Sequence, residues 1–170
     1  LLCAIGPARA QDAAWADVLA KARGQTVHWN AWAGDEKTNA FIAWVGDEVA
    51  KRHGVKVVHV KLKDTAEAVT RVVAEKAAGR DSGGSVDLVW INGANFLALR
   101  QQNLLFGPYA ERLPNWRYVD TAGKRSNLVD FTIPHEGYES PWRMAQLVFV
   151  YDSKRVGTPL SSVAALLAWA

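Results

Sequence analysis

The sequence predicts an α/β fold in which helices flank a parallel-type sheet, and three observations support this prediction. Short β-rich apolar segments alternate with longer segments whose apolar residues recur at helical spacing. Asp or Gly residues stand where several of these helical segments begin or end. The composition, 49% hydrophobic and 22% charged, is ordinary for a globular protein with a buried core. A β-α-β-α-β-α order of this kind is typical of a parallel sheet covered by helices.

The first strand and helix are predicted from residues 25–54. The segment QTVHWNAW (25–32) is β-rich, and Gly34 and Asp35 then offer a turn and a helix cap. The helix that follows ends at Gly54, a favourable C-terminal stop. Its predicted apolar stripe consists of Phe41, Ile42, Val45 and Val49.

Two further strand–helix units are predicted. Residues 55–62 read as a strand, and residues 64–79 as a helix that starts with a near capping box and ends at Gly79. Residues 85–91 are almost continuously apolar, as expected for a buried parallel strand, and residues 94–103 form a short helix.

The tetrapeptide Asp81-Ser82-Gly83-Gly84 is similar to the nucleophile loop of chymotrypsin-like proteases. Those enzymes are all-β, and their histidine and aspartate come from across two barrels. Here His28, His53 and His59 precede Ser82 within a helix–strand repeat. We therefore interpret the segment as a loop that connects a helix to a strand.

The N-terminal residues are typical of the end of a secretory signal peptide. An apolar run leads to Ala8-Arg9-Ala10, so we expect residues 1–10 to be a signal remnant, with cleavage before Gln11 and a periplasmic mature protein. Removal of Cys3 would leave no cysteine, whereas lipidation of Cys3 is disfavoured by Leu2 beside it. The last residues, 161–170, indicate a helix that continues, so we expect a part of a longer exported protein.

Several function classes are disfavoured. The net charge of +3 arises from residues spread along the chain, and the lack of a basic block argues against nucleic-acid binding. The sequence contains no Gly-x-Gly-x-x-Gly motif, no phosphate loop and no histidine–carboxylate spacing for a metal. We therefore expect neither a cofactor nor a metal.

Ligands of open parallel sheets bind beyond the carboxyl ends of the strands. Three segments qualify: residues 30–36 with Asn30 and Trp32, residues 92–95, and residues 139–146 before a predicted strand at 145–152. The first two lead into helix N-termini, which favour anions or carbonyl groups. Two alternatives stay open: turn and cap roles for Asn92 and Asn95, and a core role for Trp32.

Three segments, in their order along the chain, resemble segments of the extracellular solute-binding proteins of ABC transporters. They are TVHWNAWAGDEKTNAFIAW, SVDLVWINGANFLALRQQNLL and ESPWRMAQLVFVYD. The resemblance covers nearly all of residues 24–170 and is greatest to the YnjB-like group of substrate-binding components. It implies a two-lobed periplasmic-binding-protein fold of type II and no catalysis. Residues 24–140 would form the first lobe, residues 141–152 a crossover or hinge strand, and residues 153–170 the start of the second lobe.

The resemblance also implies a ligand site and partners. The partners would be a small polar molecule held between the lobes and the permease subunits in the inner membrane. Arg143 departs from the family, which commonly has glycine there. The implied ligand-binding residues are Trp32, Gly34, Asp35, Asn92, Gly93, Asn95, Ser140, Trp142 and Gln146.

One alternative from another class is an exported α/β hydrolase or transferase. It would need a nucleophile or an acid–base pair at a strand end, where the sequence offers only Asp35 and Glu36. Among the tryptophans, we expect Trp32 and Trp142 at the mouth of a cleft, and Trp44 and Trp90 in structural positions.

Overall fold

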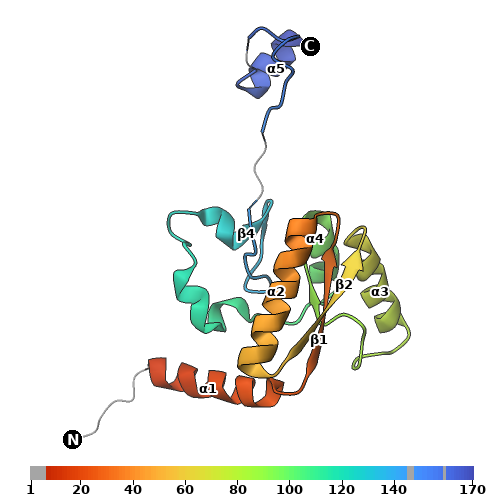
Figure 1. The fold of residues 1–170 in the computed structure, drawn as a ribbon, viewed down its shortest axis with the longest axis vertical. Helices are drawn as coiled ribbons and strands as arrows, with labels where there is room; N and C mark the ends of the chain where they lie inside the picture. Colours follow the sequence, from red (N-terminus) through yellow and green to blue (C-terminus); the bar gives the residue numbers. More distant parts are fainter. Residues whose placement is uncertain (1–6, 145–147, 159) are drawn as a thin grey trace, which may run out of the picture. The chain divides into compact units, whose positions relative to one another are not determined.

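A computed structural model describes residues 7–144, 148–158 and 160–170, with no side-chain description for residues 7–13 (Figure 1). The chain divides into two compact units, Leu1–Ser140 and Pro141–Ala170. The first unit contains the sheet and its helices, and the second contains one short helix.

The first unit contains the predicted parallel sheet. Strand β1 (Thr26–Trp32) lies in the centre, with β2 (Lys56–Leu62) on one side and β3 (Leu88–Val89) on the other. The register pairs each residue of β1 with one of β2, from Thr26 with Lys56 to Trp32 with Leu62. The α/β class, the parallel sheet and the first two strands are thus confirmed.

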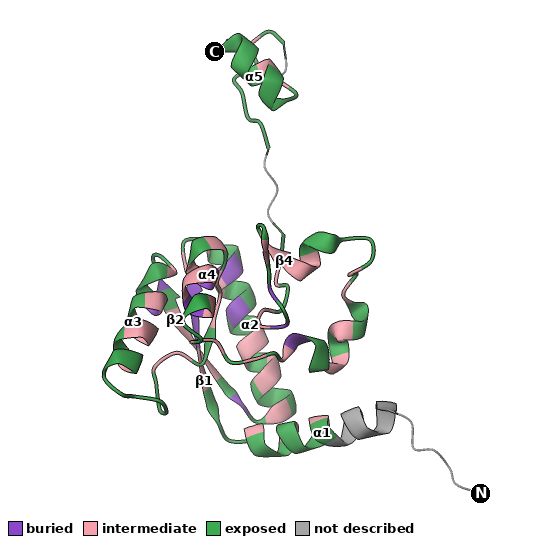
Figure 2. Cartoon of the chain, turned by 180° about the vertical axis from the view of Figure 1, so that it is seen from behind, coloured by how far each residue is buried: buried purple, intermediate pink, exposed green. Residues whose placement is uncertain are grey.

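Helices cover both faces of this sheet, as the alternating sequence pattern predicts. Helix α2 (Glu36–His53) lies on one face, and α3 (Ala66–Ala77) and α4 (Gly93–Gln101) lie on the other (Figures 1 and 2). Buried residues gather along β1 and on the helix sides that face it (Figure 2). The largest fully buried side chains are those of Phe96, Ile42, Leu99 and Asn30.

The helix ends follow the local signals in the sequence. Asp35 caps α2 by accepting a hydrogen bond from the Thr38 backbone N–H at 2.9 Å. Gly54 ends the same helix at φ 67°, a left-handed conformation that costs glycine little, and donates its N–H to the Ala50 carbonyl. At α3, the Glu67 carboxylate accepts from the Lys63 and Asp64 backbone N–H groups, as a capping box does.

Helix α1 (Pro7–Ala22) spans the expected cleavage position before Gln11, and that cleavage stays a prediction. The loop with Ser82 joins α3 to β3, as predicted, and its residue Ser85 donates its backbone N–H to the Glu75 carboxylate. This loop precedes β3, so it lies at the amino end of that strand, away from the carboxyl edge. No helix within the described part of the chain is long and apolar enough to cross a membrane.

Two predictions of burial are wrong. The strand predicted over residues 85–91 is reduced to Leu88–Val89 at an edge of the sheet, where Leu88 is 43% exposed. Trp44 was expected in a structural position, yet it is 55% exposed and lies against Phe41, with ring centroids 5.6 Å apart. The face of α2 that points inward carries Thr38 and Ile42, which turns Phe41 and Trp44 towards solvent.

Residues 104–138, for which the sequence predicts no elements, form short pieces of structure. Strands β4 (Val129–Asp130) and β5 (Ile133–Pro134) pair antiparallel. The 3-10 helices are η1 (Ala110–Arg112), η2 (Pro114–Tyr118) and η3 (Arg125–Leu128). Such short, weakly periodic elements lack the apolar repeat from which helices and strands are predicted.

In the second unit, the predicted terminal helix is present as α5 (Val163–Trp169), capped by the Ser162 hydroxyl. The crossover strand predicted within residues 141–152 is not formed at residues 141–144 or 148–152. A strand needs a neighbour for its backbone hydrogen bonds, and no neighbouring strand is present among the described residues of this unit. Residues 145–147 lie outside the described residues.

Candidate functional site

The carboxyl edge of the sheet brings the first two predicted ligand segments together. Because the three strands are parallel, they end at the same edge, and α2 and α4 begin there. The rings of Trp32, at the end of β1, and Trp90, just after β3, meet edge to face with centroids 6.3 Å apart. Trp32 remains 38% exposed, which excludes the alternative of a core aromatic.

Gly34 determines where the Trp32 ring lies. A Cβ added at Gly34 would stand 2.1 Å from Cζ2 of Trp32, far inside van der Waals contact. The ring therefore packs directly on the Gly34 backbone, an arrangement that any larger residue would prevent. Gly34 thus contributes to the site by holding an aromatic ring.

Asp35 and Asn30 have structural roles in this unit. Besides the Thr38 backbone N–H, the Asp35 carboxylate accepts the Thr38 hydroxyl, so it secures the first turn of α2. Asn30 is fully buried within β1, where it donates to the His28 carbonyl and accepts from Arg71 of α3 at 3.2 Å. Asn30 therefore lies beneath the edge, and not in the ligand segment where the sequence suggested it.

The start of α4 carries the second predicted segment. Asn92 is exposed at the N-cap position but makes no side-chain cap hydrogen bond, and Asn95 is half-buried in the first turn. Gly93 has φ 56° and donates its backbone N–H to the Asp130 carboxylate. The helix N-terminus is therefore capped by a carboxylate from a distant part of the chain, 37 positions away.

Residues 130–139 supply the side chains that sequence reasoning missed. A Cβ at Gly93 would lie 3.3 Å from the Phe131 ring, which is 77% exposed beside the start of α4. Burial, and then the nearby Asp130 charge, raise the pKa of Glu139 from 4.5 to about 8. Burial also raises the pKa of Asp130, against the opposing effects of the Gly93 hydrogen bond and of His135. No sequence motif marks these residues, because long-range folding brings them to the edge.

His135, also missed by the sequence analysis, holds this segment in place. It is 4% exposed, and its Nδ1 accepts the Gly137 backbone N–H at 2.9 Å, which assigns the ring proton to Nε2. Nε2–H then donates to the Asn127 carbonyl at 2.8 Å. The two hydrogen bonds fasten both sides of the β4–β5 hairpin to one buried ring.

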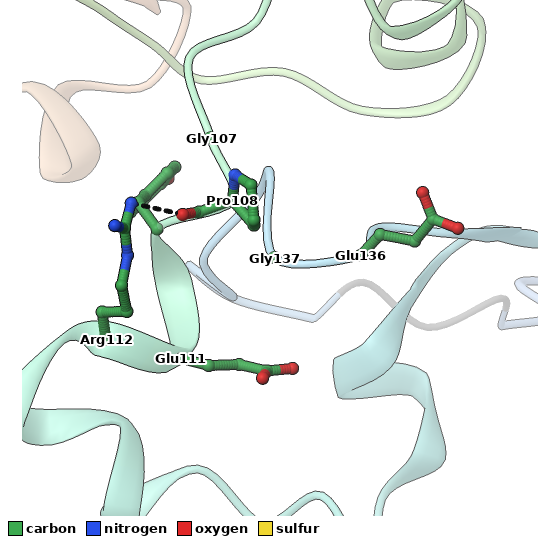
Figure 3. A pocket seen from close by; sticks show the side chains of 7 residues that line it. Gly107, Pro108, Glu111, Arg112, Glu136 and Gly137 are labelled. Carbon is green, nitrogen blue, oxygen red and sulfur yellow. Dashed lines mark hydrogen bonds between the residues drawn. The ribbon is translucent and has the colours of Figure 1, made fainter.

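A hollow of about 450 Å³ lies beside the same segment (Figure 3). Arg112, on one side, donates to the Pro108 carbonyl, while the Glu111 and Glu136 carboxylates extend on the other side. Glu136 also forms an ion pair with Arg100 at 2.6 Å. Seven residues line the hollow: Gly107, Pro108, Tyr109, Glu111, Arg112, Glu136 and Gly137.

The remaining predicted residues, Ser140, Trp142 and Gln146, follow the residues that form this edge along the chain. Ser140, the last residue of the first unit, hydrogen-bonds the Tyr109 hydroxyl through its backbone. Trp142 is half-buried and belongs to the second unit, and Gln146 lies outside the described residues. Within the ranges that are described, no group of three His, Cys, Asp or Glu side chains is placed to hold a metal ion.

The raised pKa of Glu139 predicts how stability depends on pH. Between about pH 4.5 and 8 the folded protein keeps a proton on Glu139 that the unfolded chain releases. The contribution of this group to stability is complete below about pH 4.5 and is lost as the pH rises through about 8. After allowance for partial exposure, we expect a loss of about 1–2 kcal/mol, measured by urea unfolding across this range.

The matched variants are Glu139→Gln and Glu111→Gln. The amide of Glu139→Gln cannot ionise, so this variant should lose less stability between pH 5 and 8 than the natural sequence. Glu111→Gln should lose as much as the natural sequence. Equal pH dependence in all three proteins would show that Glu139 is not held protonated.

Comparison with known proteins gives one informative similarity. The chain is similar to Protein YnjB of Escherichia coli (strain K12), with 45% identity over 156 residues. The aligned region covers 92% of this chain but 40% of YnjB, so the chain spans less than half the length of this relative. No protein-family description and no solved structure matches the sequence.

Proposed function

We propose that this chain is part of a periplasmic solute-binding component of an ABC transporter, which captures a small polar ligand and delivers it to a membrane permease. The supporting observation is where the site lies. In the sheet order β2-β1-β3, the chain leaves β1 towards β2 and later returns to its other side as β3. Ligands of open α/β sheets bind at such switch points, and Trp32, Trp90 and Asn92 lie at the ends of these two strands.

The proposal includes a two-lobed fold of type II, in which the sheet described here belongs to the first lobe. Its support is the resemblance of three sequence segments to solute-binding proteins and the position of the first two ligand segments at one sheet edge. The name of the relative YnjB states no activity. Trp142 and Gln146, expected to face the ligand, would belong to the crossover beyond Ser140. Export through the signal sequence belongs to the same proposal.

The alternative of an exported hydrolase or transferase is favoured by one feature, the raised pKa of Glu139 near Asp130. A pair of carboxyl groups with different protonation is what general acid–base catalysis requires. We prefer binding because Asp130 accepts the Gly93 backbone N–H and so also serves as a helix cap. Binding without turnover of the retained molecule distinguishes the two functions.

We expect Trp32→Ala in the full-length protein to weaken ligand binding several-fold to about tenfold, because a stacked aromatic ring contributes roughly 0.5–2 kcal/mol. The ligand is first identified by mass spectrometry of the molecule that the purified protein retains. Affinity is then measured by calorimetric titration, and stability by thermal unfolding.

Trp44→Ala is the matched control, since Trp44 is exposed on α2 away from the strand ends. It should bind the ligand as tightly as the natural protein. Unchanged affinity in Trp32→Ala, or an equal loss in both variants, would contradict a binding site at this edge.

A further inference from the structure

The charge of the ligand can be argued from the same edge, on the premise of the proposed function. We infer that the site takes an organic cation, a small molecule with an ammonium or amidinium group, and not an anion. Three features of the edge carry this inference: the occupied helix N-termini, the exposed aromatic rings and the distribution of charged side chains.

At each helix N-terminus of this edge, a carboxylate of the chain already occupies one position where an anion could bind. Free N–H groups at helix N-termini attract anions, and three helices begin at the carboxyl edge. In each of them a carboxylate of the chain accepts one of these N–H groups: Asp35 from Thr38, Asp64 from Ala66, and Asp130 from Gly93. An anionic ligand would have to displace these carboxylates and would be repelled by their charge.

Aromatic rings beside these carboxylates offer surfaces that suit a cation. Trp32 is 38% exposed and is supported edge-on by Trp90, while Phe131 is 77% exposed next to Gly93. A cation over an aromatic face is attracted by the ring electrons, and a nearby carboxylate adds charge complementarity. The exposed rings at the switch point therefore fit an organic cation, with Asp130 as its counter-charge.

The edge also carries basic side chains. Lys61 lies in β2 and Lys63 directly follows it, on the other side of β1 from β3, and Lys37 lies in the first turn of α2. The switch point itself is flanked by Trp32, Phe131 and Asp130. Of the three capping carboxylates, Asp35 follows Trp32 closely in sequence, and Asp130 contacts Gly93 at the start of α4, beside Phe131.

The test measures thermal unfolding of the full-length protein with added salts at constant ionic strength. The probes are tetramethylammonium chloride and 1,4-diaminobutane dihydrochloride on one side, sodium acetate and sodium phosphate on the other, with sodium chloride as reference. Binding to the native state raises the unfolding temperature. We expect at least one organic cation to raise it above the reference, and neither anion to do so.

Two matched variants connect this effect to the site. Asp130→Asn removes the charge but keeps an oxygen that can accept the Gly93 N–H, so the helix cap is preserved. It should weaken cation binding by about tenfold or more. Asp64→Asn makes the same change at the N-terminus of α3, next to β2, and should bind the cation as tightly as the natural protein.

Other outcomes overturn the inference in different ways. Stabilisation by acetate or phosphate, strengthened in Asp130→Asn, would show an anion site and leave the proposed function standing. A neutral retained ligand, together with no effect of either salt class on the unfolding temperature, would also overturn the inference and leave the proposed function standing. If no ligand is retained and no salt has an effect, both the inference and the proposed function fail.

Discussion

A Phe96→Ala variant is expected to lose about 3–5 kcal/mol of unfolding free energy, the usual cost of truncating a buried phenylalanine. Phe96 is 0% exposed and lies on the inner side of α4, the helix whose start forms one wall of the proposed site. Removal of its ring would leave a cavity between this helix and the sheet. Urea unfolding of the full-length protein, followed by circular dichroism, measures the loss.

Phe131→Ala is the control, because it deletes the same ring at a 77% exposed position. Its unfolding free energy should stay within about 0.5 kcal/mol of the natural protein. If the inferred cation stacks on this ring, Phe131→Ala should nevertheless weaken binding several-fold. Similar losses of stability in the two variants would mean that Phe96 is not the core residue of α4.

A His135→Ala variant is expected to lose about 2–4 kcal/mol, because two hydrogen bonds of a buried ring disappear together. The Gly137 N–H and the Asn127 carbonyl would lose the partners that they have in the folded protein. Since this ring fastens the segment that carries Asp130 and Glu139, ligand binding should weaken as well. Thermal and urea unfolding give the first effect, and titration with the identified ligand gives the second.

His53→Ala is the control for this prediction. His53 ends α2, where a histidine contributes up to about 1 kcal/mol through the helix dipole. The loss in His135→Ala should therefore be at least twice as large, and only His135→Ala should impair binding. A loss in His135→Ala no larger than that in His53→Ala would show that the buried ring does not hold the segment.

The carboxyl edge shows why only part of the site could be predicted. The sequence predicts strands that end near Trp32 and before Asn92, so the positions of Trp32, Gly34, Asn92 and Gly93 near strand ends could be inferred. Asp130 reaches the same edge through its contact with Gly93, and residues 104–128, which lead from α4 to β4, show no regular apolar period. A pattern read over a few residues contains no information about a contact of this range.

The sequence by itself determined the elements that depend on local interactions. The apolar period of α2, its cap at Asp35 and its end at Gly54 are set by residues within a few positions of each other. The same holds for β1 and β2, whose apolar content and flanking turns define them. Their parallel arrangement follows, since a helix connects them.

Only the tertiary structure decided which surfaces are covered. Trp44 and Leu88 are as apolar as core residues, but their side chains point away from the packed layers and are exposed. Residues 148–152 are rich in β-formers, yet they form no strand, because a strand exists only where another strand completes its hydrogen bonds. Burial and strand pairing each depend on two segments that pack together. The sequence of one segment does not specify which other segment it will meet.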